Sequence, residues 1–97
     1  MGNSYFKRNA KKDTNQTEIV EALRKVGAVV KHVHQLKNLF DVLVFYRGNT
    51  YCVEIKSSRK SKLTEGELEC KQELESVGVA YWVIYSVDDA MKMLKIR

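Results

Sequence analysis

Asp41, Glu54 and Lys56 are the residues of this sequence whose types and spacing could do chemistry. They form an acidic residue followed along the chain by the string Glu-x-Lys. The string alone is weak, because it occurs again as Glu69-Cys70-Lys71 in a highly charged stretch. The first occurrence differs because apolar residues surround it, and ionisable groups in apolar strands are costly unless they pair with one another or with a cation.

The predicted geometry brings these three side chains together. Arg47-Gly48-Asn49 is a tight-turn signal between two apolar runs, and we predict a two-residue turn at Gly48-Asn49. This turn would place Asp41 opposite Lys56 and diagonal to Glu54, about 5 Å and roughly 7–8 Å away. All three would share one face of the sheet, because side chains alternate between faces. An ordinary cross-strand salt bridge is the alternative interpretation.

Two carboxylates and a lysine in this arrangement suit a metal-dependent phosphodiester hydrolase. The carboxylate oxygens of Asp41 and Glu54, with the backbone carbonyl of Ile55, are ligands that Mg²⁺ or Mn²⁺ prefers. The cation would polarise a phosphate and lower the pKa of a bound water. Lys56 could orient that water and stabilise the charge of the transition state. Burial and the metal could also lower the pKa of Lys56, so that it takes a proton.

Capping and periodicity signals predict the elements that position these residues. Three capping pairs mark helix starts: Asn15 with Glu18, Thr64 with Glu67, and Ser86 with Asp89. The first two helices should end at Gly27 and Gly78. Strands are expected over residues 28–33, 39–46, 50–56 and 79–85. The predicted order is α-β-β-β-α-β-α, an α/β fold with a central mixed four-stranded sheet flanked by helices.

Length and composition favour one small domain over residues 1–97, with residues 1–13 as a basic flexible arm. No apolar run approaches the roughly 18 residues that span a bilayer, so we expect a soluble, cytoplasmic protein without a membrane partner. Cys52 and Cys70 form no disulfide or zinc pattern and are expected to be buried free thiols.

A formal charge of +5 and a pI near 9.3 are compatible with a polyanionic partner. The basic residues gather in the N-terminal arm, in one loop and beside two histidines: Lys7, Arg8, Lys11 and Lys12; Arg59, Lys60 and Lys62; Lys31 and Lys37. We expect the first two groups to contact DNA; a merely solvated surface is the alternative for any one of them. His32 and His34 should share a strand face, where exposed histidines are favoured over a metal pair. Tyr81, Trp82 and Tyr85 should pack in the core rather than stack on bases.

Beyond these patterns, the chain resembles the PD-(D/E)XK nuclease superfamily, and within it the VRR-NUC domains, many from phages and bacteria. The resemblance rests on residues 38–44, Val53-Glu54-Ile55-Lys56, and Lys62-Leu63-Thr64 running into Val77-Gly78-Val79, and covers roughly residues 14–85. It implies a restriction-endonuclease-like α-β-β-β-α-β core. It also implies that Asp41 and Glu54 bind the metal and that Lys56 is catalytic.

The resemblance extends to the first helix and departs from the family pattern twice. Glu18 matches an acid that completes the site or binds a second metal in many relatives; a simple capping role is the alternative. Phe40 replaces a common proline that shapes the backbone. Glu67 stands near the usual place of a glutamine, where a carboxylate would repel phosphate unless it caps the helix or joins the metal shell.

These resemblances predict a structure-specific endodeoxyribonuclease, acting on branched DNA such as Holliday junctions as a homodimer. A domain this short has little room for a separate recognition module, so a basic surface should read DNA shape. The alternatives are a non-catalytic nucleic-acid-binding module of the same fold and a flap- or RNA-cleaving relative. Against a sequence-specific restriction enzyme stand the short length and the lack of recognition insertions.

Overall fold

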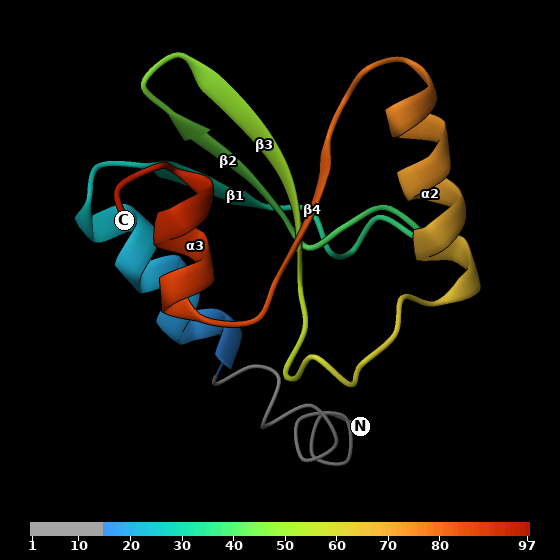
Figure 1. Cartoon of the computed structure of the whole chain (residues 1–97), viewed down its shortest axis with the longest axis horizontal. Coiled ribbons are helices and arrows are strands. Elements are labelled where there is room, and N and C mark those ends of the chain that lie inside the picture. The colour runs from blue at the N-terminus through green and yellow to red at the C-terminus, as the bar shows by residue number, and fades with distance from the viewer. Residues whose placement is uncertain (1–14) are drawn as a thin grey trace.

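The computed structural model describes residues 15–97 and contains the predicted order of elements (Figure 1). A first helix covers residues 15–25. It is followed by β1 (Val29–His32), β2 (Val42–Tyr46), β3 (Asn49–Ile55), α2 (Glu65–Ser76), β4 (Tyr81–Ile84) and α3 (Val87–Met93). The sheet order is β1-β2-β3-β4, with β1-β2 and β2-β3 antiparallel and β3-β4 parallel. The predicted mixed α/β sheet is therefore confirmed.

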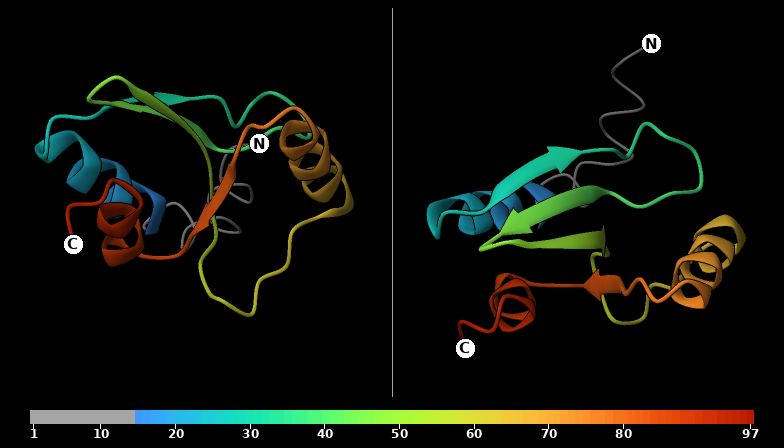
Figure 2. Two further views of the ribbon diagram at one scale, coloured as in Figure 1. Left: turned by 45° about the horizontal axis from the view of Figure 1, so that its top comes forward. Right: turned by 90° about the horizontal axis from the view of Figure 1, so that it is seen from above.

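Helices cover both faces of the sheet (Figures 1 and 2). The first helix and α3 pack on the face that carries Val42, Val44 and Val53, and together these elements form the main core. The opposite face carries Leu43 and Cys52 and packs under α2 in a second, smaller cluster. No helix within residues 15–97 is long and apolar enough to cross a bilayer.

The turn between β2 and β3 differs from the prediction by one residue. Tyr46 pairs with Asn49, so the two turn residues are Arg47 and Gly48, and both have positive φ, 48° and 81°. Two left-handed residues in a row are the mark of a type I′ turn, which matches the twist of a hairpin. The predicted turn at Gly48-Asn49 was wrong because Arg at the first turn position gave no signal for that conformation.

This change moves the strand register by two residues. Val42 pairs with Val53, so continuing the ladder places Asp41 next to Glu54, and the predicted pairing of Asp41 with Lys56 is wrong. An even shift leaves every side chain on its predicted face. Asp41 and Glu54 therefore still share the face that α2 covers.

Helix caps were predicted well except at the first helix. Thr64 and Glu67 form a full capping box at α2, and Ser86 accepts a hydrogen bond from the Asp89 N–H at α3. The predicted N-cap Asn15 instead lies within the helix. Its side chain is directed to a distant part of the chain rather than to the turn that follows it.

The predicted strand over residues 39–46 begins only at Val42. The preceding residues leave the ladder: Asn38 has a left-handed φ of 59°, and Phe40 is buried against Tyr81 in the second cluster. Their ring centroids are 6.1 Å apart and nearly perpendicular. This packing anchors the chain directly before Asp41.

Candidate metal and catalytic site

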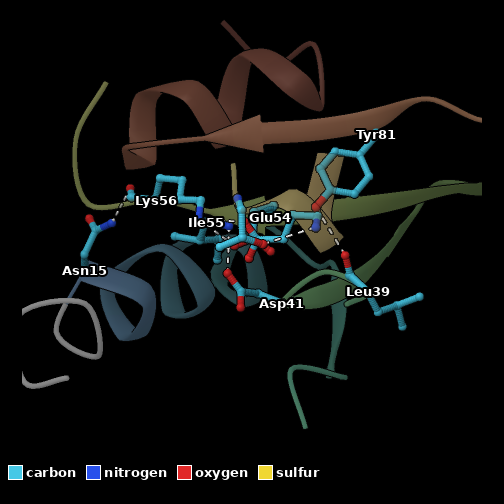
Figure 3. A network of polar contacts seen from close by, with 9 residues as sticks. Asn15, Leu39, Asp41, Glu54, Ile55, Lys56 and Tyr81 are labelled. Carbon is cyan, nitrogen blue, oxygen red and sulfur yellow. Dashed lines mark hydrogen bonds and ion pairs between the residues drawn. The ribbon is translucent and has the colours of Figure 1, made fainter. Parts of the chain in front are cut away.

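Asp41 is fixed by hydrogen bonds at the end of the β2-β3 ladder. Its N–H donates to the carbonyl of Val53 at 3.0 Å, and its own carbonyl accepts from Val33 at 2.9 Å. Its carboxylate Oδ2 accepts from the backbone N–H of Ile55 at 2.9 Å. Asp41 is buried, and this main-chain contact holds its carboxylate beside β3 (Figure 3).

Glu54 is the most deeply buried acid of the described chain, with 1% of its surface exposed. Burial and then the neighbouring charges of Asp41 and Glu67 raise the pKa of its carboxyl to about 8, against the opposing effect of Lys56. A carboxyl in this setting is held as the neutral acid unless a cation enters. Asp41 and Glu54 thus lie on one face of the sheet and line one pocket, as expected, and their binding of a metal stays a prediction.

Lys56 directly follows β3 and is also buried. Its Nζ lies 2.8 Å from Oε1 of Glu67 and 3.4 Å from Oε2 of Glu54. Burial lowers the pKa of Lys56, but the hydrogen bond to Glu67 and the charges of Glu54 and Glu67 outweigh it, so the pKa is raised. The lowering expected from burial and a bound metal stays a prediction, because in the metal-free chain the neighbouring acids outweigh burial.

The backbone of Lys56 is clamped on both sides. Its N–H donates to the carbonyl of Ile84 on β4 at 3.0 Å, and its carbonyl accepts from the Asn15 amide on the first helix at 3.0 Å (Figure 3). These contacts join the first helix, β3 and β4 at one point. They fix the direction in which the Lys56 side chain leaves the sheet.

The sequence leaves two roles open for Glu67, as a helix cap or as a part of the metal shell. Its Oε1 accepts from the Thr64 N–H at 2.9 Å, which closes the capping box, and the same oxygen pairs with Lys56. Burial raises its pKa, but the hydrogen bonds from Lys56 and Thr64 outweigh this and lower it. The Thr-x-x-Glu capping signal located this residue, whereas its contact with Lys56 required the fold.

A polar pocket of about 80 Å³ opens beside these acids and is lined by Asp41, Glu54 and Glu67, with His34, Asn38 and Thr64 at its edge. Because one water takes up about 30 Å³ of liquid, this volume accommodates a cation with a few waters. Within residues 15–97 no group of three or more His, Cys, Asp or Glu side chains is arranged to hold a metal ion. Mg²⁺ commonly takes one or two protein carboxylates and fills its other positions with water and phosphate oxygens.

The acidic lining of this pocket has the chemistry of a site for a hard divalent cation. Two buried acids, Asp41 and Glu54, line the same pocket, and the buried ammonium of Lys56 lies 3.4 Å from Glu54 and already pairs with Glu67. A divalent cation would stabilise the ionised form of Glu54 against the burial and the neighbouring acids that raise its pKa. The residues present therefore fit the predicted Mg²⁺ or Mn²⁺.

Glu18 lies apart from this pocket. It is exposed on the first helix and is not among the residues that line the pocket. It stands three positions after Asn15, however, and such residues share a helix face. Glu18 is therefore on the helix face whose Asn15 contacts Lys56.

Only part of the predicted basic surface falls within the described residues. Lys7, Arg8, Lys11 and Lys12 lie outside the described residues. Lys60 and Lys62 are exposed. Arg59 donates to both carboxylate oxygens of Asp89, at 2.8 and 2.9 Å, and its guanidinium lies 4.5 Å from the Tyr85 ring centroid.

The two histidines and the aromatic residues of β4 are the remaining site candidates. His32 ends β1, and His34 follows in the connection, so the two do not share a strand; their rings are 5.8 Å apart and both residues are exposed. Burial, together with Arg24 and His34, lowers the pKa of His32. Tyr81 is buried as predicted, and Trp82 packs at the edge of the main core.

Replacing Glu54 by Gln should change how stability depends on pH. The folded pKa of about 8 exceeds the model-peptide value of 4.5, so the stabilisation of the neutral form is complete below 4.5 and is lost as pH rises through 8. The melting temperature of the metal-free protein should fall by about 5 °C or more relative to Glu54→Gln between pH 5 and 8. Circular dichroism melts in EDTA would measure this.

The comparison with Glu54→Gln isolates one carboxyl. His32, whose lowered pKa acts in the opposite direction, is present in both proteins and cancels. Glu69→Gln, on the exposed part of α2, is the matched control and should follow the wild type. Parallel curves for wild type and Glu54→Gln would show that the Glu54 carboxyl titrates normally.

The fold is shared with a solved structure described as a VRR_NUC domain. The TM-score is 0.73 at 22% sequence identity, and the match covers 88% of this chain and 95% of that one. No protein-family profile matches the sequence, and no curated protein matches it significantly. The shared architecture confirms the predicted fold.

Proposed function

We propose that this chain is a metal-dependent nuclease that hydrolyses phosphodiester bonds of DNA. The observation that carries the proposal is the buried pair Asp41 and Glu54, placed beside Lys56 at the end of two strands. Buried acids of this kind are costly to folding and are commonly retained for a function. The VRR_NUC fold supports the same conclusion, since that domain is named for nuclease activity.

The metal site would be formed by Asp41 and Glu54, with the backbone carbonyl of Ile55. Bound there, Mg²⁺ or Mn²⁺ would polarise the scissile phosphate and acidify a water molecule. Asp41 is already held by the Ile55 N–H, which limits the side-chain entropy lost on binding. Glu54 must lose its proton first, so its raised pKa makes metal binding pH-dependent.

Glu18 would complete the site from the first helix. Its helix is fastened to the site by the Asn15–Lys56 hydrogen bond, and the two residues share a helix face. An exposed carboxylate here can bind a second cation or an outer water without the cost of burial. We propose this role in preference to a capping role, because Asn15 does not act as the N-cap.

Lys56 would stabilise the negative charge that develops on the phosphate. Its pKa is raised in the metal-free chain, so we propose that it acts as an electrostatic and hydrogen-bond donor. Accepting a proton is the alternative role once a bound metal lowers this pKa. Glu67 holds the ammonium in place at 2.8 Å and is itself fixed by the α2 capping box. The carboxylate of Glu67 thus serves as a positioning residue, which accounts for an acid where relatives often have glutamine.

We further propose branched DNA as the substrate and a homodimer as the active form. The net charge of +5 and the exposed Lys60 and Lys62, in the loop that follows Lys56, suit contacts to phosphates, which fix position without reading sequence. A four-way junction has two symmetric strands to cut, and a two-fold dimer would present two sites to them.

A substrate panel tests this function. Purified protein should cleave branched DNA faster than linear duplex, single-stranded DNA or RNA, in Mg²⁺ or Mn²⁺ and not in EDTA. Tight DNA binding with no cleavage in either metal would contradict the nuclease and favour a binding module. Preferential cleavage of flaps or RNA would retain the nuclease and overturn the junction substrate.

Sedimentation equilibrium tests the dimer separately. A species of twice the 11.2 kDa chain mass is expected at micromolar concentration, alone or on a junction. A monomer under both conditions would contradict the homodimer.

A further inference from the structure

A second and larger pocket lies at the hairpin end of the sheet, away from the carboxylates. Its volume is about 480 Å³, and it lies between the β2-β3 turn and the residues that follow α3. We call it the aromatic pocket and define it by Tyr46, Tyr51, Trp82, Arg47, Lys95 and Ile96. This volume falls in the range of small-ligand sites.

The aromatic pocket and the metal site lie on different faces of the sheet. Tyr51 shares its face with Val53, toward the first helix and α3, whereas Glu54 points to the face under α2. From Thr50 to Glu54 the strand rises about 13 Å. A ligand in the aromatic pocket would therefore leave the metal site open.

Three aromatic side chains form the apolar part of the pocket. Tyr51 and Trp82 make an edge-to-face contact, with centroids 6.0 Å apart at 65°. Both rings, like Tyr46, are only partly buried against the main core. Partly exposed rings on a rigid sheet provide surfaces on which an unstacked base can lie.

The charge of the pocket is cationic. Its lining contains Arg47 and Lys95, and among the described residues it includes no aspartate or glutamate. The Arg47 guanidinium lies 5.3 Å from the Tyr46 ring centroid, which places a cation beside an aromatic surface. Aromatic rings with nearby cations and no acids are the composition of single-strand-binding surfaces.

Both cations lie at backbone positions with a left-handed conformation. Arg47 has φ of 48° and Lys95 has φ of 63°. Glycine adopts this left-handed conformation without penalty, whereas other residues such as arginine and lysine pay for it. The type I′ turn requires this conformation at Arg47, and Lys95 adopts it where the chain leaves α3. Both cations line the same pocket.

We propose that the aromatic pocket binds an unpaired segment of DNA, with bases on Tyr51 and Trp82 and phosphates on Arg47 and Lys95. The proposal rests on the proposed function only in naming DNA as the polymer. It assigns a second contact that would hold a single-stranded arm of a branched substrate apart from the site of cleavage. Phosphate contacts there would add to salt-dependent affinity without base specificity.

Trp82 is the only tryptophan in the sequence, so its fluorescence reports on this pocket directly. The full-length protein in EDTA, where no cleavage is expected, would be titrated with a ten-nucleotide oligothymidylate. We expect saturable quenching of Trp82 emission. Lys95→Glu should weaken the binding about tenfold. The slope of the logarithm of the binding constant against the logarithm of salt concentration should become about 0.7 less negative.

Lys25→Glu is the matched control, since it makes the same change in charge at another exposed lysine, outside the pocket. It should weaken binding less than twofold. Equal effects of the two substitutions, or absence of quenching, would overturn the proposal. Stronger quenching by duplex DNA or by oligouridylate would also overturn it, as would DNA-independent quenching that grows with protein concentration and indicates self-association.

The assay separates this proposal from the nuclease proposal. Binding in EDTA does not depend on Asp41, Glu54 or a metal, so a protein without cleavage can still bind at the aromatic pocket. Conversely, cleavage of branched DNA with no response of Trp82 would leave the nuclease intact and remove the second site.

Discussion

Lys56→Ala should reduce the rate of DNA cleavage by about 10²–10³-fold, the usual cost of removing one transition-state donor. The ammonium is the buried cation of the site, and it lies within 3.4 Å of Glu54 and 2.8 Å of Glu67. DNA affinity should stay within about threefold of wild type, because one phosphate contact contributes little to the total. Single-turnover cleavage of a labelled junction in saturating Mg²⁺ measures the rate, and anisotropy in EDTA measures the affinity.

Lys60→Ala is the matched control for this substitution. It removes a lysine of the same loop region that is exposed and does not line the pocket of acids. Its cleavage rate should remain close to wild type in saturating protein. A Lys56→Ala protein that is folded by circular dichroism and still cleaves at the wild-type rate would show that Lys56 is structural.

Asp41→Asn should abolish metal binding and cleavage while keeping the fold. The asparagine carbonyl can still accept the Ile55 N–H, so the contact that fixes this side chain is preserved. The lost negative charge should weaken Mn²⁺ binding by at least about 100-fold, the upper end of the cost of perturbing a metal's surroundings. Cleavage should fall by about 10³-fold or more, since metal activation of water and phosphate is removed.

Titration calorimetry measures the affinity for Mn²⁺. Glu69→Gln, on the exposed side of α2, is the control. In the wild type, binding should tighten by about tenfold per pH unit from pH 6 to 8, because the entering cation displaces the Glu54 proton. Unchanged Mn²⁺ affinity in Asp41→Asn would place the metal elsewhere. A pH-independent affinity would mean that Glu54 is already ionised.

Sequence reasoning located the acids and the lysine because local signals determine them. Apolar alternation placed Asp41 and Glu54 on one sheet face, and capping residues placed the helix starts at Thr64 and Ser86. The register could not be predicted, because it depends on whether Arg47 or Asn49 takes a left-handed turn position. The error was harmless to the site only because a shift of two residues conserves the faces.

The electrostatics of the site could not be read from the sequence. The Lys56–Glu67 contact joins residues of different elements, and it helps to raise the Lys56 pKa in the metal-free chain. The contact of Asn15 with the Lys56 carbonyl likewise crosses the fold and replaces a predicted cap. Both depend on how α2 and the first helix approach the end of β3, which is a tertiary property.

Anomalous diffraction from crystals grown in Mn²⁺ tests the central claim most directly. We expect a manganese peak in the polar pocket, within coordination distance of carboxylate oxygens of both Asp41 and Glu54, and no such peak in crystals of Asp41→Asn. A peak at His32 and His34 alone, or a pocket without manganese at saturating concentration, would contradict the proposed metal centre.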